Sequence, residues 1–167
     1  MKRREKMMEC PGCGLRLPDQ QIESPHRYNA TGECYQKYNE LSFYTMSQQD
    51  LHFVHQHAID TYSAQHAGAG MKNITVAFSL IGLYYAIELG FTGNQVQRVH
   101  MLLSQRPYNW PSLPLPENLY LITVQDVLKE KPGKNRDVML REWMYDVWRC
   151  WEHQHDWVKN ISNHLLR

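Results

Sequence analysis

The sequence lacks a long hydrophobic run, and this absence excludes a membrane-spanning helix. Such a helix needs roughly 18–20 mostly apolar residues, whereas the longest apolar stretch, residues 74–89, is interrupted by polar and small residues. The interruptions are Thr75, Ser79, Gly82 and Glu88. The basic start of the chain is followed by Glu9 and Cys10 rather than by the apolar segment of a secretory signal. We therefore expect a soluble, cytoplasmic protein with no membrane partner.

The chain also lacks a strong net charge. Its formal net charge is +1, which provides no global field that would attract nucleic acid. One local basic cluster lies at the N-terminus, and its composition is typical of a solvated terminus. The cluster consists of Lys2, Arg3, Arg4 and Lys6. Nucleic acid is therefore disfavoured as a partner.

Cysteine is scarce, and the motifs of common catalytic sites are missing. The chain has four cysteines in 167 residues. A domain of this length buries about two thirds of its unfolded surface, so it forms a core without disulfides, and we expect the thiols to be reduced. An HExxH motif, a paired Glu-x-x-His and a nucleophile elbow are all absent. No local motif therefore predicts a reaction.

What the sequence does contain is the composition of a globular, helical domain. It is 43% hydrophobic and 21% charged, as in compact folded domains. Residues 1–34 are rich in proline, glycine and polar side chains, which predicts a loop-built knuckle. We expect a single domain over residues 1–167, in which this knuckle packs on an all-α helical bundle formed by residues 35–167.

Helix signals divide the bundle into segments. Apolar periodicity and capping residues predict helices over 33–44, 47–66, 72–89, 92–105, 124–129 and 135–167. Ser47 and Thr123 are the expected N-caps of two of them. The third is apolar almost all round, which is typical of a central, buried helix. The proline-rich residues 106–118 predict an ordered strap pinned by Trp110, and residues 119–123 are the one brief strand candidate.

The motif Cys10-Pro-Gly-Cys13-Gly is the sharpest chemical signal in the chain. Two thiolates separated by two residues can bind one metal ion from a single turn, and the glycines let the backbone amides face the sulfurs. The alternative is a redox-active pair, but the βαβ pattern that accompanies such pairs is missing. Zinc is therefore the expected cofactor.

Tetrahedral zinc needs two further ligands, and two candidates follow within the next 21 residues. Twelve residues separate Cys13 from His26, and seven separate His26 from Cys34. The expected ligand set is thus Cys10, Cys13, His26 and Cys34. Cys34 could instead be a buried free thiol, and His26 could be a polar residue facing the bundle, which would leave the fourth position to another group. A closed site of this kind has a structural role.

Three of the nine histidines fall on the apolar faces of expected helices, namely His55, His66 and His155. His55 and His66 are about 16 Å apart along a straight helix, so they cannot share one ion. A convergent pair would therefore include His155, with either His55 or His66 as its partner and Asp60, Tyr62 or Glu88 nearby. His66 is favoured because it lies at a helix end, where a pocket can open. The commoner arrangement is that each buried histidine bonds separately to a tyrosine or a carboxylate.

The order of the motifs resembles that of a bacterial family of small proteins known only as a domain of unknown function. The motifs run from Cys-Pro-Gly-Cys-Gly, His26 and Cys34 through Asp60-x-Tyr-x-x-Gln-His66 and Leu80-Ile-Gly-Leu83 to Val147-Trp-x-x-Trp-x-x-x-His155. The resemblance implies that the cysteines and histidines named above, together with His55 and Asp60, belong to a shared pattern. Relatives often carry histidine where this chain has Ser79. A looser similarity is to DinB-type helical bundles, which bind a metal through three inward histidines.

Two functions remain open at this point. The first is a zinc-stabilised binding or accessory protein without catalysis, whose partner is a small molecule or another protein. The second is a metal-dependent enzyme, a hydrolase or thiol-handling transferase, with His55, Asp60, His66 and His155 as candidate catalytic residues. Cys150 is expected to be a small, buried thiol that binds no metal.

Overall fold

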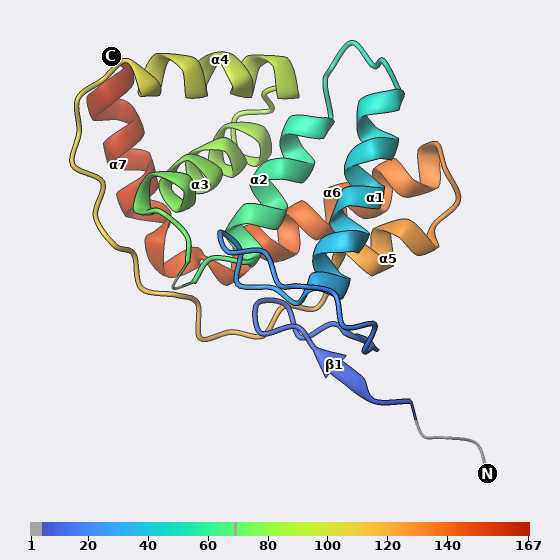
Figure 1. Cartoon of the computed structure of the whole chain (residues 1–167). Coiled ribbons are helices and arrows are strands. Elements are labelled where there is room, and N and C mark those ends of the chain that lie inside the picture. Colours follow the sequence, from blue (N-terminus) through green and yellow to red (C-terminus); the bar gives the residue numbers. More distant parts are fainter. Residues whose placement is uncertain (1–4, 69) are drawn as a thin grey trace.

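The computed structural model describes residues 5–68 and 70–167, and it is mostly helical (Figure 1). Its helices are α1 (Gly32–Ser47), α2 (His55–Gln65), α3 (Asn73–Ile87), α4 (Gly93–Ser104), α5 (Val124–Lys129), α6 (Lys134–Cys150) and α7 (His155–Leu166). Two short strands, β1 (Met7–Glu9) and β2 (Arg16–Pro18), precede them. The expected helical bundle with an N-terminal knuckle is therefore confirmed. None of the described helices is both long enough and apolar enough to cross a membrane.

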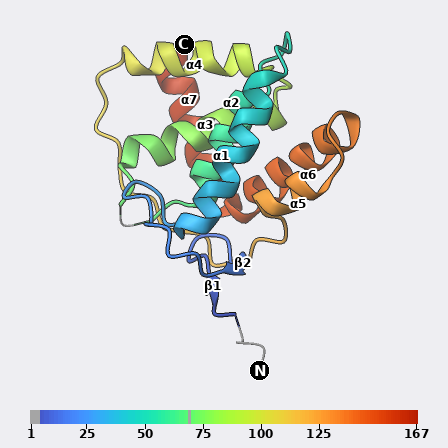
Figure 2. The same cartoon turned by 45° about the vertical axis from the view of Figure 1, so that its right-hand side comes forward.

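The centre of the bundle is formed by α2 and α3. Helix α2 packs against α1, α3, α4 and α6, and its residues Asp60 to Gln65 are all buried (Figure 2). Gln65 is one of its buried polar side chains that are paired inside the protein. Gln65 donates to the Ile122 carbonyl at 2.8 Å and accepts from the Trp143 indole at 3.0 Å. Helix α3 is buried from Val76 to Leu83 except at Phe78, which confirms the prediction of a central apolar helix.

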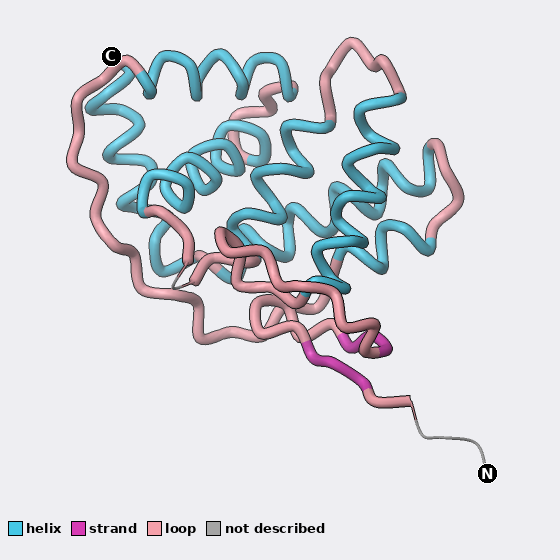
Figure 3. Tube along the Cα trace, in the orientation of Figure 1, coloured by secondary structure: helices cyan, strands magenta, loops and turns pink. Residues whose placement is uncertain are grey.

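The proline-rich strap runs along the outside of the bundle from α4 to α5 (Figure 3). Trp110 holds its first half, with its ring edge-on to Phe78 at 5.3 Å and its carbonyl accepting from Asn73. The buried carboxylate of Asp146 accepts from the backbone amides of Leu121 and Ile122 at 2.8 and 2.9 Å. The strap is thus pinned by Trp110 as expected, but residues 119–123, the strand candidate, form no strand.

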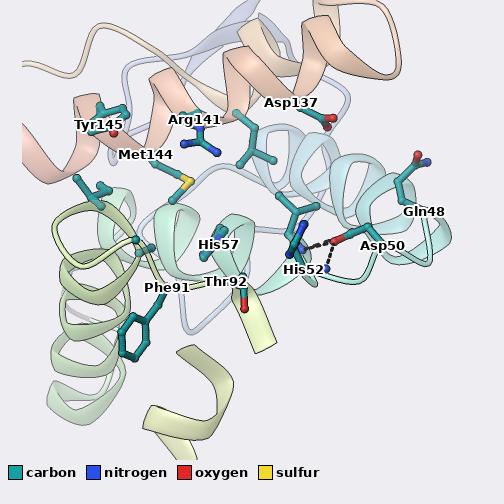
Figure 4. Close-up of a pocket in the computed structure, with 15 residues that line it drawn as sticks. Gln48, Asp50, His52, His57, Phe91, Thr92, Asp137, Arg141, Met144 and Tyr145 are labelled. Carbon is teal, nitrogen blue, oxygen red and sulfur yellow. Dashed lines mark hydrogen bonds between the residues drawn. The ribbon is translucent and has the colours of Figure 1, made fainter. Parts of the chain in front are cut away.

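Two helix boundaries differ from the sequence prediction. Ser47 ends α1 instead of capping α2, because its hydroxyl donates back to the Tyr44 carbonyl at 2.8 Å. The turn before α2 is organised by Asp50, whose carboxylate accepts from the amides of His52 and Val54 (Figure 4). The expected last helix is broken at Trp151, where φ is −91° and ψ is 16°, so α6 and α7 are separate helices.

The knuckle contains an antiparallel hairpin that sequence periodicity did not predict. Met7 pairs with Pro18 and Glu9 with Arg16. Each strand has only three residues, too few for an alternating pattern to stand out. The hairpin places residues 10–15 at its tip. Of the N-terminal basic cluster, only Lys6 lies within the described residues.

Candidate metal centre

The hairpin tip presents the first two thiols. The Cys10 amide donates to the Leu15 carbonyl and the Gly14 amide to the Cys10 carbonyl, both at 2.8 Å, which closes a tight turn. Gly14 has a φ of 77°, a conformation that glycine adopts at low cost. A Cβ on Gly12 would lie 2.7 Å from the ring of His66, and closer still to the Asn29 carbonyl. The turn therefore packs directly on His66 because Gly12 has no side chain.

Cys34 enters the cluster from the first turn of α1. Its backbone amide is capped by the Thr31 hydroxyl at 3.2 Å, which fixes the start of the helix. The thiol is fully buried, as is that of Cys10, and Cys13 is 7% exposed. Cys34 lies in the helix that the sequence predicts over residues 33–44, and the helix gives its side chain a fixed direction.

His66 completes the group from the C-terminal end of α2. Its Nδ1 lies 2.9 Å from the Tyr62 carbonyl, and its ring stacks on the Tyr62 ring with centroids 3.9 Å apart. A carbonyl can only accept, so Nδ1 carries the proton and Nε2 has a free lone pair. Nε2 lies 3.4 Å from the Cys34 sulfur. This is the orientation that second-sphere hydrogen bonds impose on metal-binding histidines.

The spacing of the four ligand atoms fits a tetrahedral zinc ion. All of them lie within 4.8 Å of one another, with 3.8 Å between the sulfurs of Cys13 and Cys34. Bonds of about 2.3 Å to sulfur and about 2.0–2.1 Å to nitrogen imply tetrahedral edges of about 3.8 Å for two sulfurs and about 3.5 Å for sulfur and nitrogen. A disulfide would need about 2.05 Å. The arrangement therefore suits an ion and not a covalent bond.

Packing three thiols together separates their pKa values. The pKa of Cys10 is lowered, chiefly by its hydrogen bond with Cys13, and the pKa of Cys13 is raised, chiefly by the same hydrogen bond. The hydrogen bond with Cys10 contributes most to raising the pKa of Cys34 to about 12. One thiolate is thus favoured, while further ionisation brings like charges together. A divalent cation would remove this repulsion and displace the remaining protons.

Three tyrosines, Tyr28, Tyr38 and Tyr62, form an aromatic wall on one side of Cys34 and His66. The Tyr62 hydroxyl lies 3.5 Å from the Cys34 sulfur, and burial raises the pKa of Tyr62, so the hydroxyl keeps a proton to donate to a thiolate. The Tyr62 ring stacks on Tyr38 at 4.0 Å and meets Tyr28 edge-on at 5.2 Å. This wall excludes water from one side of the cluster.

The structure brings together three of the four residues expected to bind zinc, and it replaces the fourth. His26 is not part of the cluster, because its side chain is 96% exposed and lies 3.8 Å from the Glu23 carboxylate on the surface. His66 takes its place. His26 was favoured because it lies between Cys13 and Cys34 in the chain, but the fold brings the end of α2 to the hairpin tip. Cys150 lies apart, with its thiol 3.6 Å from the Leu119 carbonyl.

The structure gives separate partners to the histidines proposed for a second site. Both ring nitrogens of His66 are engaged, Nδ1 by the Tyr62 carbonyl and Nε2 by the Cys34 sulfur. The His155 Nε2 lies 2.8 Å from the Trp148 carbonyl, and its ring stacks on Trp148 at 3.7 Å. His55 pairs with the Thr45 hydroxyl at 2.8 Å. The straight last helix that aligned His155 with the core is interrupted at Trp151.

Asp60 belongs to a different buried group, formed with Gln56 and His100. Its Oδ1 accepts from the Gln56 amide at 3.2 Å, while its Oδ2 is 3.7 Å from the His100 Nε2, which donates to the Phe78 carbonyl instead. Burial raises the pKa of Asp60 well above its usual range and lowers that of His100. Gly82 allows α3 to approach, because a Cβ there would overlap the Asp60 carboxyl group. Asp60 therefore lies in a buried polar group that is separate from the Cys/His cluster.

Residues 8–152 match the model of a family of unknown function (DUF5946). The matched region contains all four residues of the cluster and most of the bundle, which confirms the resemblance inferred from the order of the motifs. No curated protein and no solved structure matches the chain.

Proposed function

The chain belongs to that family, and we propose that it is a zinc-binding protein in which the ion has a structural role. The observation that supports this most directly is the buried group of Cys10, Cys13, Cys34 and His66. Three thiolates and one imidazole are a donor set that suits zinc. Four protein ligands fill a tetrahedral shell, whereas catalytic zinc sites keep a position for water or substrate.

The ion would join the hairpin to α1 and α2, which already pack on each other. The hairpin strands are exposed or half-buried at all six positions, so the knuckle has little apolar core of its own. Cys10 and Cys13 lie at the hairpin tip, Cys34 begins α1 and His66 follows α2. A zinc ion bound by all four would fix the knuckle on this end of the bundle.

The proposed role is binding rather than catalysis. The histidines that could have formed a catalytic centre are each engaged by separate partners, His55 by Thr45 and His155 by Trp148. Within residues 5–68 and 70–167, the Cys/His cluster is the group of three or more potential ligands whose atoms converge. We therefore favour a zinc-stabilised binding or accessory protein over a metal-dependent enzyme.

Metal analysis and cobalt substitution test this proposal together. Protein purified without chelator should contain one zinc ion per chain by elemental analysis. Exchange for Co²⁺ should give the intense visible absorption of a tetrahedral thiolate site, because all four ligands come from the protein. A second equivalent of bound metal, or a cobalt spectrum that changes when anions such as azide are added, would contradict a single closed site.

A further inference from the structure

A cavity of about 480 Å³ lies on the bundle, separate from the metal centre. It opens between the loop before α2, the turn after α3 and one face of α6 (Figure 4). Its apolar lining includes Ile87, Leu140 and Met144, and its polar lining includes His57 and Arg141. Cavities of about 300–1,000 Å³ with an apolar lining and a few polar groups are typical small-molecule sites.

Arg141 supplies an uncompensated positive charge to this cavity. No carboxylate among the described residues forms an ion pair with its guanidinium, although ion pairs are found elsewhere on the bundle. The two acidic residues of the lining, Asp50 and Asp137, form no ion pair with it. The Asp50 carboxylate accepts from two backbone amides instead, and Figure 4 draws both carboxylates apart from the Arg141 guanidinium.

His57 provides a second polar group that lacks a partner in the described part of the chain. Its buried Nδ1 has no hydrogen-bond partner in the described part of the chain. Burial, followed by the charge of Arg141, lowers the pKa of His57 to about 4, so the ring is neutral and close enough to Arg141 to sense its charge. Buried polar atoms without a partner are uncommon in folded proteins, and each needs an explanation.

We propose that this cavity binds a small amphipathic carboxylate, with the carboxylate on Arg141 beside His57 and the apolar part on Ile87, Leu140 and Met144. Guanidinium and carboxylate groups form paired, charge-assisted hydrogen bonds. The ligand charge would balance Arg141, and the three apolar side chains would cover its hydrocarbon part. This proposal is independent of the zinc ion, since none of the cluster residues lines the cavity.

Calorimetric titration with three probes of equal length tests the proposal. The probes are octanoate, octan-1-ol and octylamine, which are anionic, neutral and cationic at pH 7.5. Octanoate should bind with a dissociation constant of about 1 mM or lower, given its small number of atoms. Its affinity should exceed that of the alcohol by about tenfold, because a hydrogen bond to an ionised group adds this much. Octylamine should bind most weakly.

Arg141→Met should reduce octanoate affinity to that of the alcohol without unfolding the protein, because Arg141 is exposed. Arg98→Met is the matched control, since Arg98 is an exposed arginine on α4 outside the cavity lining. NMR shifts on octanoate addition should concentrate on the methyl groups of Ile87 and Met144. Equal affinity for the three probes, unchanged binding by Arg141→Met, or shifts confined to the knuckle would overturn the proposal. Zinc content does not enter these readouts, so the two proposals can fail separately.

Discussion

At the scale of single residues, the proposed zinc site depends on a glycine as well as on the four residues of the cluster. Gly12 separates the two cysteines of the hairpin tip, and a Cβ there would press on the His66 ring and the Asn29 carbonyl. Gly12→Ala should therefore lower zinc affinity by tenfold or more and destabilise the protein by about 2 kcal/mol, a typical cost of overpacking. A competition titration with a chromophoric chelator measures the affinity.

Gly14→Ala is the matched control for that substitution. Gly14 has a φ of 77° but nothing within 4 Å of an added Cβ. The alanine should cost about 1 kcal/mol of backbone strain and leave zinc affinity within a few-fold of the wild type. If both variants lose zinc equally, the contact between Gly12 and His66 is not what matters.

The titration of Asp60 should make the free energy of unfolding depend on pH. Burial raises the pKa of Asp60 in the folded protein. The contribution of this raised pKa to the free energy of unfolding is therefore complete below the unfolded-state pKa of about 3.9. It is lost as the pH rises through the folded-state pKa. Asp60→Asn cannot ionise. Its free energy of unfolding relative to the wild type should therefore rise between pH 4 and pH 8 by about 1 kcal/mol or more, since one pKa unit corresponds to about 1.4 kcal/mol. Urea unfolding at both pH values measures this, and a constant difference would show that Asp60 is ionised with a partner.

At the scale of elements, a buried carboxylate on α6 holds the segment that connects the strap to α5. Asp146 is 6% exposed and accepts from the amides of Leu121 and Ile122. Asp146→Ala leaves both amides without this partner, so it should cost about 1–3 kcal/mol and speed proteolysis of residues 105–123. Arg149→Met removes only the exposed partner of Asp146 and should cost less than about 1 kcal/mol. Strap cleavage that is equal in the two variants would contradict this role of Asp146.

The same scale shows which elements could be inferred from the sequence. The helix over 124–129 begins after Thr123 as its capping pattern predicts, and the apolar run of α3 identifies the buried centre. The end of α1 was missed because serine near a helix terminus can either cap the next helix or bond back to its own. Tertiary contacts decide which of the two roles a serine takes, and the periodicity of the sequence does not report those contacts.

At the scale of the whole molecule, part of the Cys/His cluster could be predicted from the sequence and part could not. Cys10 and Cys13 are three residues apart, and this spacing alone predicts that their sulfurs lie close together. His66 lies 32 residues after Cys34 and joins it only because α1 and α2 pack side by side. His26, which was favoured for its nearness in sequence, therefore lies outside the cluster, while His66, which was expected on an inward helix face, lies inside it.

The fourth ligand is the central claim of this account, and paired histidine variants test it most directly. His66→Ala should reduce bound zinc from one ion per chain to well below one in elemental analysis after dialysis against a weak chelator. His66→Cys should restore binding, because four cysteines also form a tetrahedral zinc site. His26→Ala, the same change at an exposed histidine, should retain one ion. Full zinc retention by His66→Ala together with zinc loss by His26→Ala would contradict the account.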